Sequence, residues 1–241
     1  MRVIHAPTAQ AFAKEAADHI GALLLDNPRA ALALPSGATP LGLYAELARR
    51  ARTGSVRLEE ARIFSLDEYC GVAPEDPRSF AHYFRRHLVG PLGLLDDQID
   101  VLNGAAADAG VECARFERAI AAQSGLDLCV LGLGANGHIA FNEPGSPFDL
   151  CTHVAALAEA TRARLKAHGW EASRIPTHGL TLGIGNVLEA RRILLLVAGR
   201  GKEAAAASLY RGVEDESWPV TGLLRHAHVT VIDAGVPEAP P

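Results

Sequence analysis

The stretch LDLCVLGLGANGHIAFNEPGS, residues 126–146, decides the fold. Its first half is almost entirely apolar, which is typical of a strand that is buried on both faces of a sheet. A glycine-rich loop follows at once and carries a histidine and a glutamate. In open α/β sheets, ligands bind beyond the carboxyl ends of the strands. The stretch therefore predicts a buried parallel strand that ends in a functional loop.

Short apolar runs of the same kind recur along the chain and alternate with segments of helical periodicity. The runs lie in RAALALPSG, ARIFSLDEYCG, DQIDVLNG, ARRILLLVAG and HVTVIDAG. This alternation predicts an α/β protein with a doubly wound, mostly parallel sheet and helices on both faces, Rossmann-like in arrangement. The sequence contains no proline- or serine-rich linker, so we expect one domain over residues 1–241, with a frayed tail at residues 235–241.

The composition limits the class of function. Of the 241 residues 49% are hydrophobic, which allows a sizeable core, and a net charge of −5 without a basic block argues against a nucleic-acid partner. No apolar run is long enough for a membrane span and no signal peptide is recognisable, so we expect a cytoplasmic protein. The cysteines lack CxxC spacing, so we expect reduced thiols and no metal site; they are Cys70, Cys113, Cys129 and Cys151.

Polar or glycine-rich segments end four of the predicted strands, at residues 34–40, 65–69, 132–144 and 198–202. We expect these ends to face one crevice. The first, LPSGATP, has the composition of a phosphate-binding loop ahead of a helix N-terminus, with Ser36, Gly37, Ala38 and Thr39 as the candidate residues. It can equally be an ordinary strand-to-helix turn with Thr39 as N-cap and Pro40 at the first helical position, and the two interpretations are compatible.

Three of these strand ends carry candidate chemical groups. Lys202 can meet an anion as a point charge or lie in solvent. Asp67 occupies the position of a general base, with a solvated carboxylate as the alternative. His138 and Glu143 are the stronger candidates for catalysis. A histidine can transfer a proton near neutral pH, and a carboxylate bonded to one ring nitrogen fixes its tautomer. The segment GLGANG does not continue as a dinucleotide fingerprint, and GxxxxGK[ST] is absent from the loop after the first apolar run, so that loop is not a P-loop.

Taken together, these segments resemble the glucosamine-6-phosphate deaminase (isomerase) family over nearly the whole chain. LPSGATPLGLY is similar to the family's phosphate loop, SLDEYCGVAPEDPRSFAHYF to the segment with its catalytic aspartate, and GLGANGHIAFNEPGS to its signature. IPTHGLTLGIGNVLEARRILLLVAGRGKEAA resembles its late sheet and phosphate lysine. The related 6-phosphogluconolactonases share the fold and a GHxA core but lack FNEP.

The resemblance implies a role for each candidate residue. Asp67 would move the proton between C2 and C1, His138 would assist opening of the pyranose ring, and Glu143 would orient and tune His138. The phosphate would be held by residues 36–39 and Lys202. No metal or organic cofactor is implied.

The chain departs from the family's pattern at three places. Asn136 stands where many members have an aspartate; we count it among the catalytic residues, but expect His138 to depend on Glu143 alone. The arginine of the family's ANSRFF-like stretch has no counterpart in register, which leaves Lys166 and Arg174 as alternatives. Asn186 replaces the usual threonine.

The implied reaction converts glucosamine 6-phosphate and water to fructose 6-phosphate and ammonia, and we expect the enzyme to be classed with the hydrolases as well as the isomerases and deaminases. The alternatives are another amino-sugar phosphate such as galactosamine 6-phosphate, hydrolysis of 6-phosphogluconolactone, or a sensor without catalysis. Where effector-regulated hexameric members carry hydroxyl and basic residues, this chain has Pro147, Asp149, His153 and Ala155. We therefore expect a monomer or small homo-oligomer without effector response.

Overall fold

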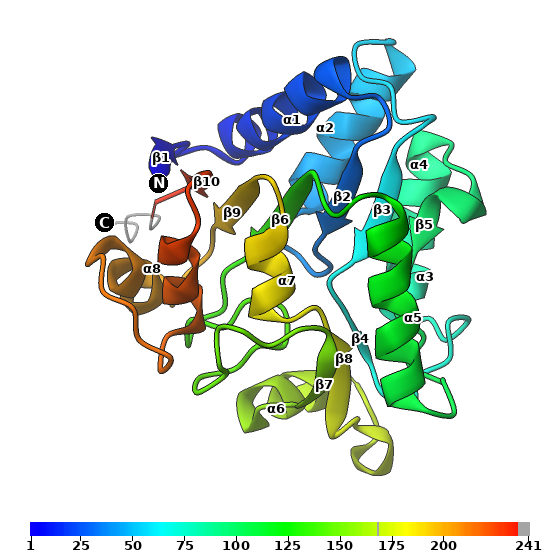
Figure 1. The fold of residues 1–241 in the computed structure, drawn as a ribbon, viewed down its shortest axis with the longest axis vertical. Helices are drawn as coiled ribbons and strands as arrows, with labels where there is room; N and C mark the ends of the chain where they lie inside the picture. Colours follow the sequence, from blue (N-terminus) through cyan, green and yellow to red (C-terminus); the bar gives the residue numbers. More distant parts are fainter. Residues whose placement is uncertain (168, 236–241) are drawn as a thin grey trace.

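The structure, a computed structural model, describes residues 1–167 and 169–235 (Figure 1). Apart from Gly235, the tail that we expected to be frayed lies outside the described residues. Within the described residues, no helix is both long enough and apolar enough to cross a bilayer.

A seven-stranded parallel sheet forms the centre of the molecule, in the order β1-β10-β9-β6-β2-β3-β5. Its strands are β1 (Arg2–His5), β2 (Ala31–Leu34), β3 (Arg62–Ser65), β5 (Ile99–Asp100), β6 (Leu128–Gly132), β9 (Ile193–Val197) and β10 (Val229–Asp233). Strands β2, β3 and β5 follow one another toward one edge of the sheet. The next strand of this sheet, β6, pairs with the other side of β2. This reversal between β2 and β6 is a topological switch point, where ligands of such sheets bind.

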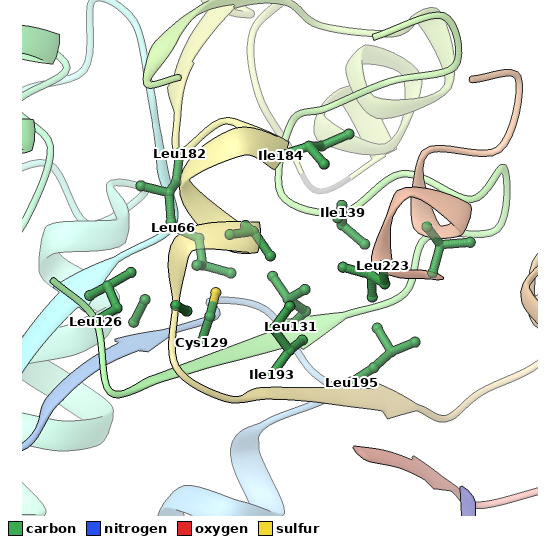
Figure 2. Close-up of a cluster of buried hydrophobic side chains, with 14 of the residues drawn as sticks. Leu66, Leu126, Cys129, Leu131, Ile139, Leu182, Ile184, Ile193, Leu195 and Leu223 are labelled. Carbon is green, nitrogen blue, oxygen red and sulfur yellow. The ribbon is translucent and has the colours of Figure 1, made fainter. Parts of the chain in front are cut away.

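Helices cover both faces of the sheet, as the alternation of apolar runs predicted. Alternate residues of β6 divide between two cores: Leu128 and Val130 pack toward α1 and α2, whereas Cys129 and Leu131 pack toward α5 and α7. Figure 2 shows the second core, with Cys129 and Leu131 beside the neighbouring strand β9 and the 3₁₀ helix that contains Leu223. The helices are α1 (Ala9–Asp26), α2 (Leu41–Arg52), α5 (Ala109–Ala122), α7 (Ile184–Glu189) and α8 (Glu203–Tyr210). The expected doubly wound architecture is confirmed.

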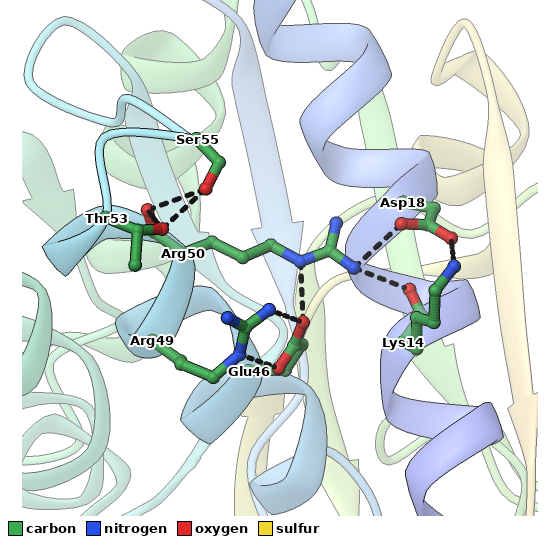
Figure 3. Close-up of polar contacts among 7 residues, drawn as sticks. All are labelled: Lys14, Asp18, Glu46, Arg49, Arg50, Thr53 and Ser55. Atoms are coloured by element: carbon green, nitrogen blue, oxygen red, sulfur yellow. Dashed lines mark hydrogen bonds and ion pairs between the residues drawn. The ribbon is translucent and has the colours of Figure 1, made fainter.

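Helices α1 and α2 are also joined by ion pairs (Figure 3). Arg50 of α2, whose side chain is 12% exposed, contacts Asp18 of α1 and Glu46 of its own helix, each at 2.7 Å. Glu46 also accepts hydrogen bonds from Arg49, and Asp18 pairs with Lys14. Hydrogen bonds from Arg49 and Arg50 lower the pKa of Glu46 to about 2. Arg50 is therefore the residue through which the two helices share one polar network.

A helical region follows β4 and closes the β3 side of the molecule. It runs from α3 (Phe80–Phe84) through a π-helical turn (Arg85–Val89) into α4 (Gly90–Leu92). Short 3₁₀ helices at Asp96–Gln98, Ala172–Arg174 and Pro219–Arg225 complete the connections.

A second, three-stranded antiparallel sheet was not predicted. It consists of β4 (Asp67–Tyr69), β8 (His178–Thr181) and β7 (His153–Ala156), in that order. Helix α6 (Glu159–Ala167) lies between β7 and β8 in the chain. A separate aromatic-rich core, which includes Tyr69, Phe141 and Trp170, packs these elements together. The small sheet matters because its first strand begins with Asp67.

Candidate active site

The candidate residues gather at the switch point between β2 and β6. The loop after β2 carries Ser36–Thr39, the loop after β6 carries Asn136–Glu143, and Lys202 follows β9. Asp67 lies two residues beyond the end of β3, which pairs with β2. Since all these strands are parallel, their carboxyl ends share one edge of the sheet. The expectation that the four strand ends face one region is therefore consistent with the fold.

The loop after β2 is held in shape by two tyrosines. The hydroxyl of Tyr44 on α2 donates to the carbonyl of Pro35 at 2.5 Å, and that of Tyr83 on α3 donates to the carbonyl of Gly37 at 2.6 Å. Gly37 has φ +88°, a left-handed conformation that glycine adopts without strain. The two hydrogen bonds from the tyrosine hydroxyls therefore hold the backbone of the loop at Pro35 and Gly37.

Our assignment of the helix cap was wrong by one residue. Pro40, not Thr39, is the N-cap of α2, and no side chain caps this helix. The hydroxyl of Thr39 instead accepts a hydrogen bond from Nζ of Lys202 at 3.5 Å. The first-turn N–H groups of α2 are therefore left without a side-chain acceptor, which suits them to an anion.

Lys202 occupies the N-cap position of α8, as expected for a lysine that opens a helix. Its contact with Thr39 brings the N-termini of α2 and α8 together. Burial and the neighbouring Arg164 lower the pKa of Lys202. A cation held near two helix N-termini makes this point strongly favourable for negative charge.

Asp67 is buried, with 8% of its surface exposed. Burial, together with the adjacent carboxyl group of Glu68, raises the pKa of Asp67 to about 8. Two interactions lower the pKa of Asp67 in part: the positive charge of Arg164 and a hydrogen bond from the hydroxyl of Ser36. Ser36 thus joins the phosphate loop to the expected base. An acid with a pKa near the physiological range can both take up and return a proton.

Asn136 lies between His138 and Glu143, and the expectation that His138 depends on Glu143 alone was wrong. Oδ1 of Asn136 lies 2.7 Å from Nδ1 of His138, whereas the nearest Glu143 oxygen is 3.6 Å away. Nδ2 of Asn136 donates to that same Glu143 oxygen at 2.8 Å. The carboxylate of Glu143 is therefore linked to the His138 ring by hydrogen bonds through the amide of Asn136.

This arrangement determines the tautomer of His138. An ionised Glu143 can only accept, so the amide nitrogen of Asn136 must face it and the amide oxygen must face His138. The backbone N–H of His138 also donates to that oxygen, which supports the assignment. The neutral ring consequently carries its hydrogen on Nδ1 and presents Nε2 as a proton acceptor. Burial, with help from Arg164 and Lys202 and against the effect of Glu143, lowers the pKa of His138 and keeps the ring neutral.

Two glycines make room for this relay. A Cβ on Gly134 would lie 2.4 Å from the His138 ring, and a Cβ on Gly137 would lie 2.8 Å from the ring of Trp218. Gly137 also has φ +85°. The glycines of this loop therefore leave the space that the His138 ring and Trp218 occupy, and a bound dinucleotide is not needed to account for them.

Arg164 is the functional residue that the sequence reasoning missed. Its positive charge lowers the pKa of Asp67, His138 and Lys202. Its guanidinium donates a hydrogen bond to the hydroxyl of Tyr69. Arg164 adjoins the buried Leu165 on α6 and lies one turn from the buried Thr161. That helical spacing is the signal that the sequence offers for Arg164, which lies out of register with the arginine of the family's ANSRFF-like stretch.

The two residues left open for the missing arginine lie elsewhere. The positive charge of Arg174 helps to lower the pKa of Asp76, which is not one of the candidate residues. Lys166 is exposed and follows Arg164 by two positions, which points it away from Arg164 on a helix. Asn186 lies at the start of α7, where its side chain accepts from the backbone N–H of Gly183 and from Thr152. It therefore has a structural role in the turn that precedes α7.

The described residues include no group of three or more histidine, cysteine or acidic side chains that could hold a metal ion. All four cysteines are free thiols. One oxygen of Glu143, Oε1, is buried and has no hydrogen-bond partner in the described part of the chain. The candidate residues supply carboxyl, imidazole, guanidinium and ammonium groups.

Comparison with known proteins agrees with this chemistry. Residues 5–232 match the model of the family described as glucosamine-6-phosphate isomerases/6-phosphogluconolactonase. The chain is 40% identical to a glucosamine-6-phosphate deaminase of Beutenbergia cavernae, over 96% of this chain and 89% of the relative. It is 37% identical to the deaminase of Halalkalibacterium halodurans, over 96% of this chain and 94% of the relative.

Solved structures give the same result. A monomeric glucosamine-6-phosphate deaminase superposes with a TM-score of 0.93 at 33% identity, covering 97% of both chains. The 6-phosphogluconolactonase from Thermotoga maritima has a TM-score of 0.75 at 18% identity, also covering 97% of both chains, and shows the shared fold.

One expectation about reaction class was wrong. The similar proteins are deaminases, so the class "hydrolase" does not apply, whereas isomerase and deaminase do. The buried carboxyl group of Asp67, with its raised pKa, is suited to the transfer of a carbon-bound proton, which is the step that an isomerase needs. The chain belongs to the family of glucosamine-6-phosphate isomerases and 6-phosphogluconolactonases.

Proposed function

We propose that the protein converts glucosamine 6-phosphate to fructose 6-phosphate and ammonia. The observation that carries this proposal is the pairing of a buried carboxyl group, Asp67, with a neutral histidine that presents Nε2. An aldose–ketose isomerisation needs both: one group that opens the ring and another that moves a carbon-bound proton. The names of the similar proteins support the same substrate.

The phosphate group of the substrate binds first to the loop after β2. The N–H groups at the start of α2 donate to it, and the ammonium group of Lys202 supplies charge. Arg164 adds a second cation and takes the part of the arginine that is absent from the family's register. It reaches the site from α6, which lies between β7 and β8 of the small sheet in the chain.

His138 then opens the pyranose ring. Nε2 accepts the proton of the anomeric hydroxyl and returns it to the ring oxygen, which yields the open-chain aldehyde. Asn136 and Glu143 stabilise the imidazolium that exists between the two transfers, because the Nδ1 proton is directed at an amide oxygen backed by a carboxylate.

Asp67 carries out the isomerisation. Its carboxylate removes the proton from C2, which gives an enolamine, and its carboxyl group returns the proton to C1. The resulting imine at C2 takes up water and releases ammonia. Burial raises the pKa of Asp67 to about 8, which makes its carboxylate a stronger base toward the carbon-bound proton than an ordinary aspartate.

The test is an assay of ammonia and ketose phosphate released from glucosamine 6-phosphate, galactosamine 6-phosphate and 6-phosphogluconolactone. We expect turnover of glucosamine 6-phosphate, with exchange of the C2 proton into deuterated solvent. Asp67→Asn should retain the fold and lower kcat by roughly 10²-fold or more, the scale of a lost general base. Turnover of the lactone alone, or near-normal turnover by Asp67→Asn, would refute the proposal.

A further inference from the structure

A cavity of about 420 Å³ lies at the edge of the main sheet opposite to the active site. It opens where β1, β6, β9 and β10 begin, whereas the active-site loops follow the strands' carboxyl ends. In Figure 1 these strands lie toward the side where the N-terminus is marked, with α1 running beside them. The floor is apolar and includes Leu23 of α1, Leu128 of β6 and Leu194 of β9, all of them buried.

The rim of this cavity is basic. Arg2, Arg192, His19 and His228 line it, and none of the aspartates and glutamates that the structure describes does. Within residues 1–167 and 169–235, neither Arg2 nor Arg192 has a side-chain hydrogen bond or ion pair. The mouth of the cavity therefore carries two guanidinium groups that have no acidic partner among the described residues.

The strand register places these groups close together. Arg2 is the first residue of β1 and pairs with Thr230 of β10, while Arg192 and His228 directly precede the paired residues Ile193 and Val229. Neighbouring strands are about 4.8 Å apart, so the basic groups of three adjacent strands fall within roughly 10 Å. His19 adds a ring from α1, with Nδ1 held by the carbonyl of Glu15 at 3.0 Å. Its Nε2 is consequently the nitrogen available to a ligand.

We propose that this cavity is a second binding site, for phosphate monoesters with an aromatic body, such as nucleoside 5′-monophosphates. The two guanidinium groups match a phosphate monoester, which carries a charge near −2 at neutral pH and accepts bidentate hydrogen bonds from arginine. The apolar floor matches a flat ring, and the volume lies in the range of small-molecule sites. A polar amino-sugar phosphate would leave that floor without a partner, so the ligand differs from the proposed substrate.

The experiment is isothermal titration of the purified protein with AMP, with adenosine and inorganic phosphate as partial ligands. We expect AMP to bind at least about tenfold more tightly than either part, because it uses both the floor and the rim. Arg2→Ala and Arg192→Ala should each weaken AMP binding about tenfold or more, the scale of a lost charge-assisted hydrogen bond. Arg118→Ala is the matched control: it removes an exposed arginine from α5, away from the cavity, and should leave the affinity unchanged.

Lys202→Ala separates this cavity from the active-site phosphate loop. We expect that variant to bind AMP as the unmodified protein does. Binding that requires Lys202 but not Arg192 would place AMP in the active site and overturn the proposal. So would the absence of AMP binding, or inorganic phosphate that binds as tightly as AMP.

Discussion

At the scale of single residues, Asn136 decides how His138 takes part in the reaction. Its amide donates to Glu143 and accepts from His138, so one side chain fixes both the ring orientation and the tautomer. A carboxylate at this position would have no proton to donate to Glu143. The two carboxylates would then repel each other, and both would act directly on the imidazole.

Asn136→Asp should therefore raise the pKa of His138. Because the neutral ring is the proton acceptor, a higher pKa removes the active form as the pH falls, and the acid limb of the kcat/KM profile should move to higher pH. A shift of about one unit lowers kcat/KM about tenfold on that limb and leaves the value at pH 8 less affected. The pH–rate profile of the variant provides the measurement. A uniform loss at all pH values would show that the amide has a purely structural role.

Asp67 also links activity to stability. Its pKa is about 8 in the folded protein and near 4 in the unfolded chain, so between these values the folded state binds the extra proton. Stability therefore falls as the pH rises through this window, and the unfavourable contribution of Asp67 is complete above pH 8. Desolvation of the carboxylate is its main cause.

Asp67→Asn should accordingly stabilise the protein, and the gain should grow with pH. We expect little difference near pH 4 and more than about 1 kcal/mol at pH 8.5. Thermal or urea unfolding at several pH values measures it. A gain that does not vary with pH would mean that the folded-state pKa of Asp67 is not raised.

At the scale of secondary-structure elements, two helices determine the shape of the phosphate loop. Tyr44 belongs to α2 and Tyr83 to α3, and their rings contact each other edge to face, with centroids 6.4 Å apart. Glu68 anchors α3 in turn, since its carboxylate accepts from the backbone N–H groups of Tyr69 and Ala81. The phosphate loop and the strand with the expected base are thus connected through α3.

Tyr83→Phe should raise KM for the phosphorylated sugar severalfold and change kcat little. The variant keeps the ring contacts but loses one hydrogen bond, worth about 1 kcal/mol, which holds the loop in its binding conformation. Tyr210→Phe is the control, because it removes an exposed hydroxyl bond to Asp233. A loss of kcat at constant KM would show that Tyr83 acts on the chemical step instead.

The ion pairs between α1 and α2 lead to a prediction about stability. Arg50→Ala should lower the free energy of unfolding by about 1–3 kcal/mol, because it removes a largely buried guanidinium that bonds to both helices. Arg49→Ala should change it by less than about 0.5 kcal/mol, since that side chain is 56% exposed and pairs within its own helix. Urea unfolding compares the two variants directly, and equal effects would contradict the assignment.

Part of this architecture could be predicted from the sequence. Continuous apolar runs such as LLLV in β9 identify strands that are buried on both faces, and these runs gave the parallel sheet. The antiparallel sheet has no such signal, since β4 reads Asp-Glu-Tyr and β7 alternates between exposed and buried positions over four residues. Its strands are defined by partners distant in the chain, so local pattern could not reveal them. Arg164 was missed with that sheet, because α6 belongs to the same region.

At the scale of the whole molecule, the segment that would carry an effector site is unsuited to a phosphate. Asp149 and Pro147 precede β7, and β7 itself presents His153 and Ala155 where regulated relatives are expected to carry basic residues. Asp149 repels an anion, and proline provides no N–H donor. An effector shifts an equilibrium only through contacts that differ between two states, and few are available here.

We therefore expect hyperbolic kinetics, no activation by N-acetylglucosamine 6-phosphate, and a monomer or small oligomer. The similar structure of a deaminase described as monomeric supports this expectation. Initial rates with and without the effector, together with light scattering, provide the test. Sigmoidal curves that become hyperbolic with the effector, or a hexamer in solution, would contradict it.

The contact between Lys202 and Thr39 has a consequence for how the protein reaches its active form. The two residues are 163 positions apart in the sequence, yet their contact brings together the two ends of the phosphate site. Contacts of such long sequence separation carry a high entropic cost of closure and slow folding. The pairing of β1 with β10 joins residues still farther apart in the sequence, so the phosphate site and the closed sheet both depend on contacts between distant parts of the chain. Substrate that binds only the completed site then favours the last step of folding by mass action.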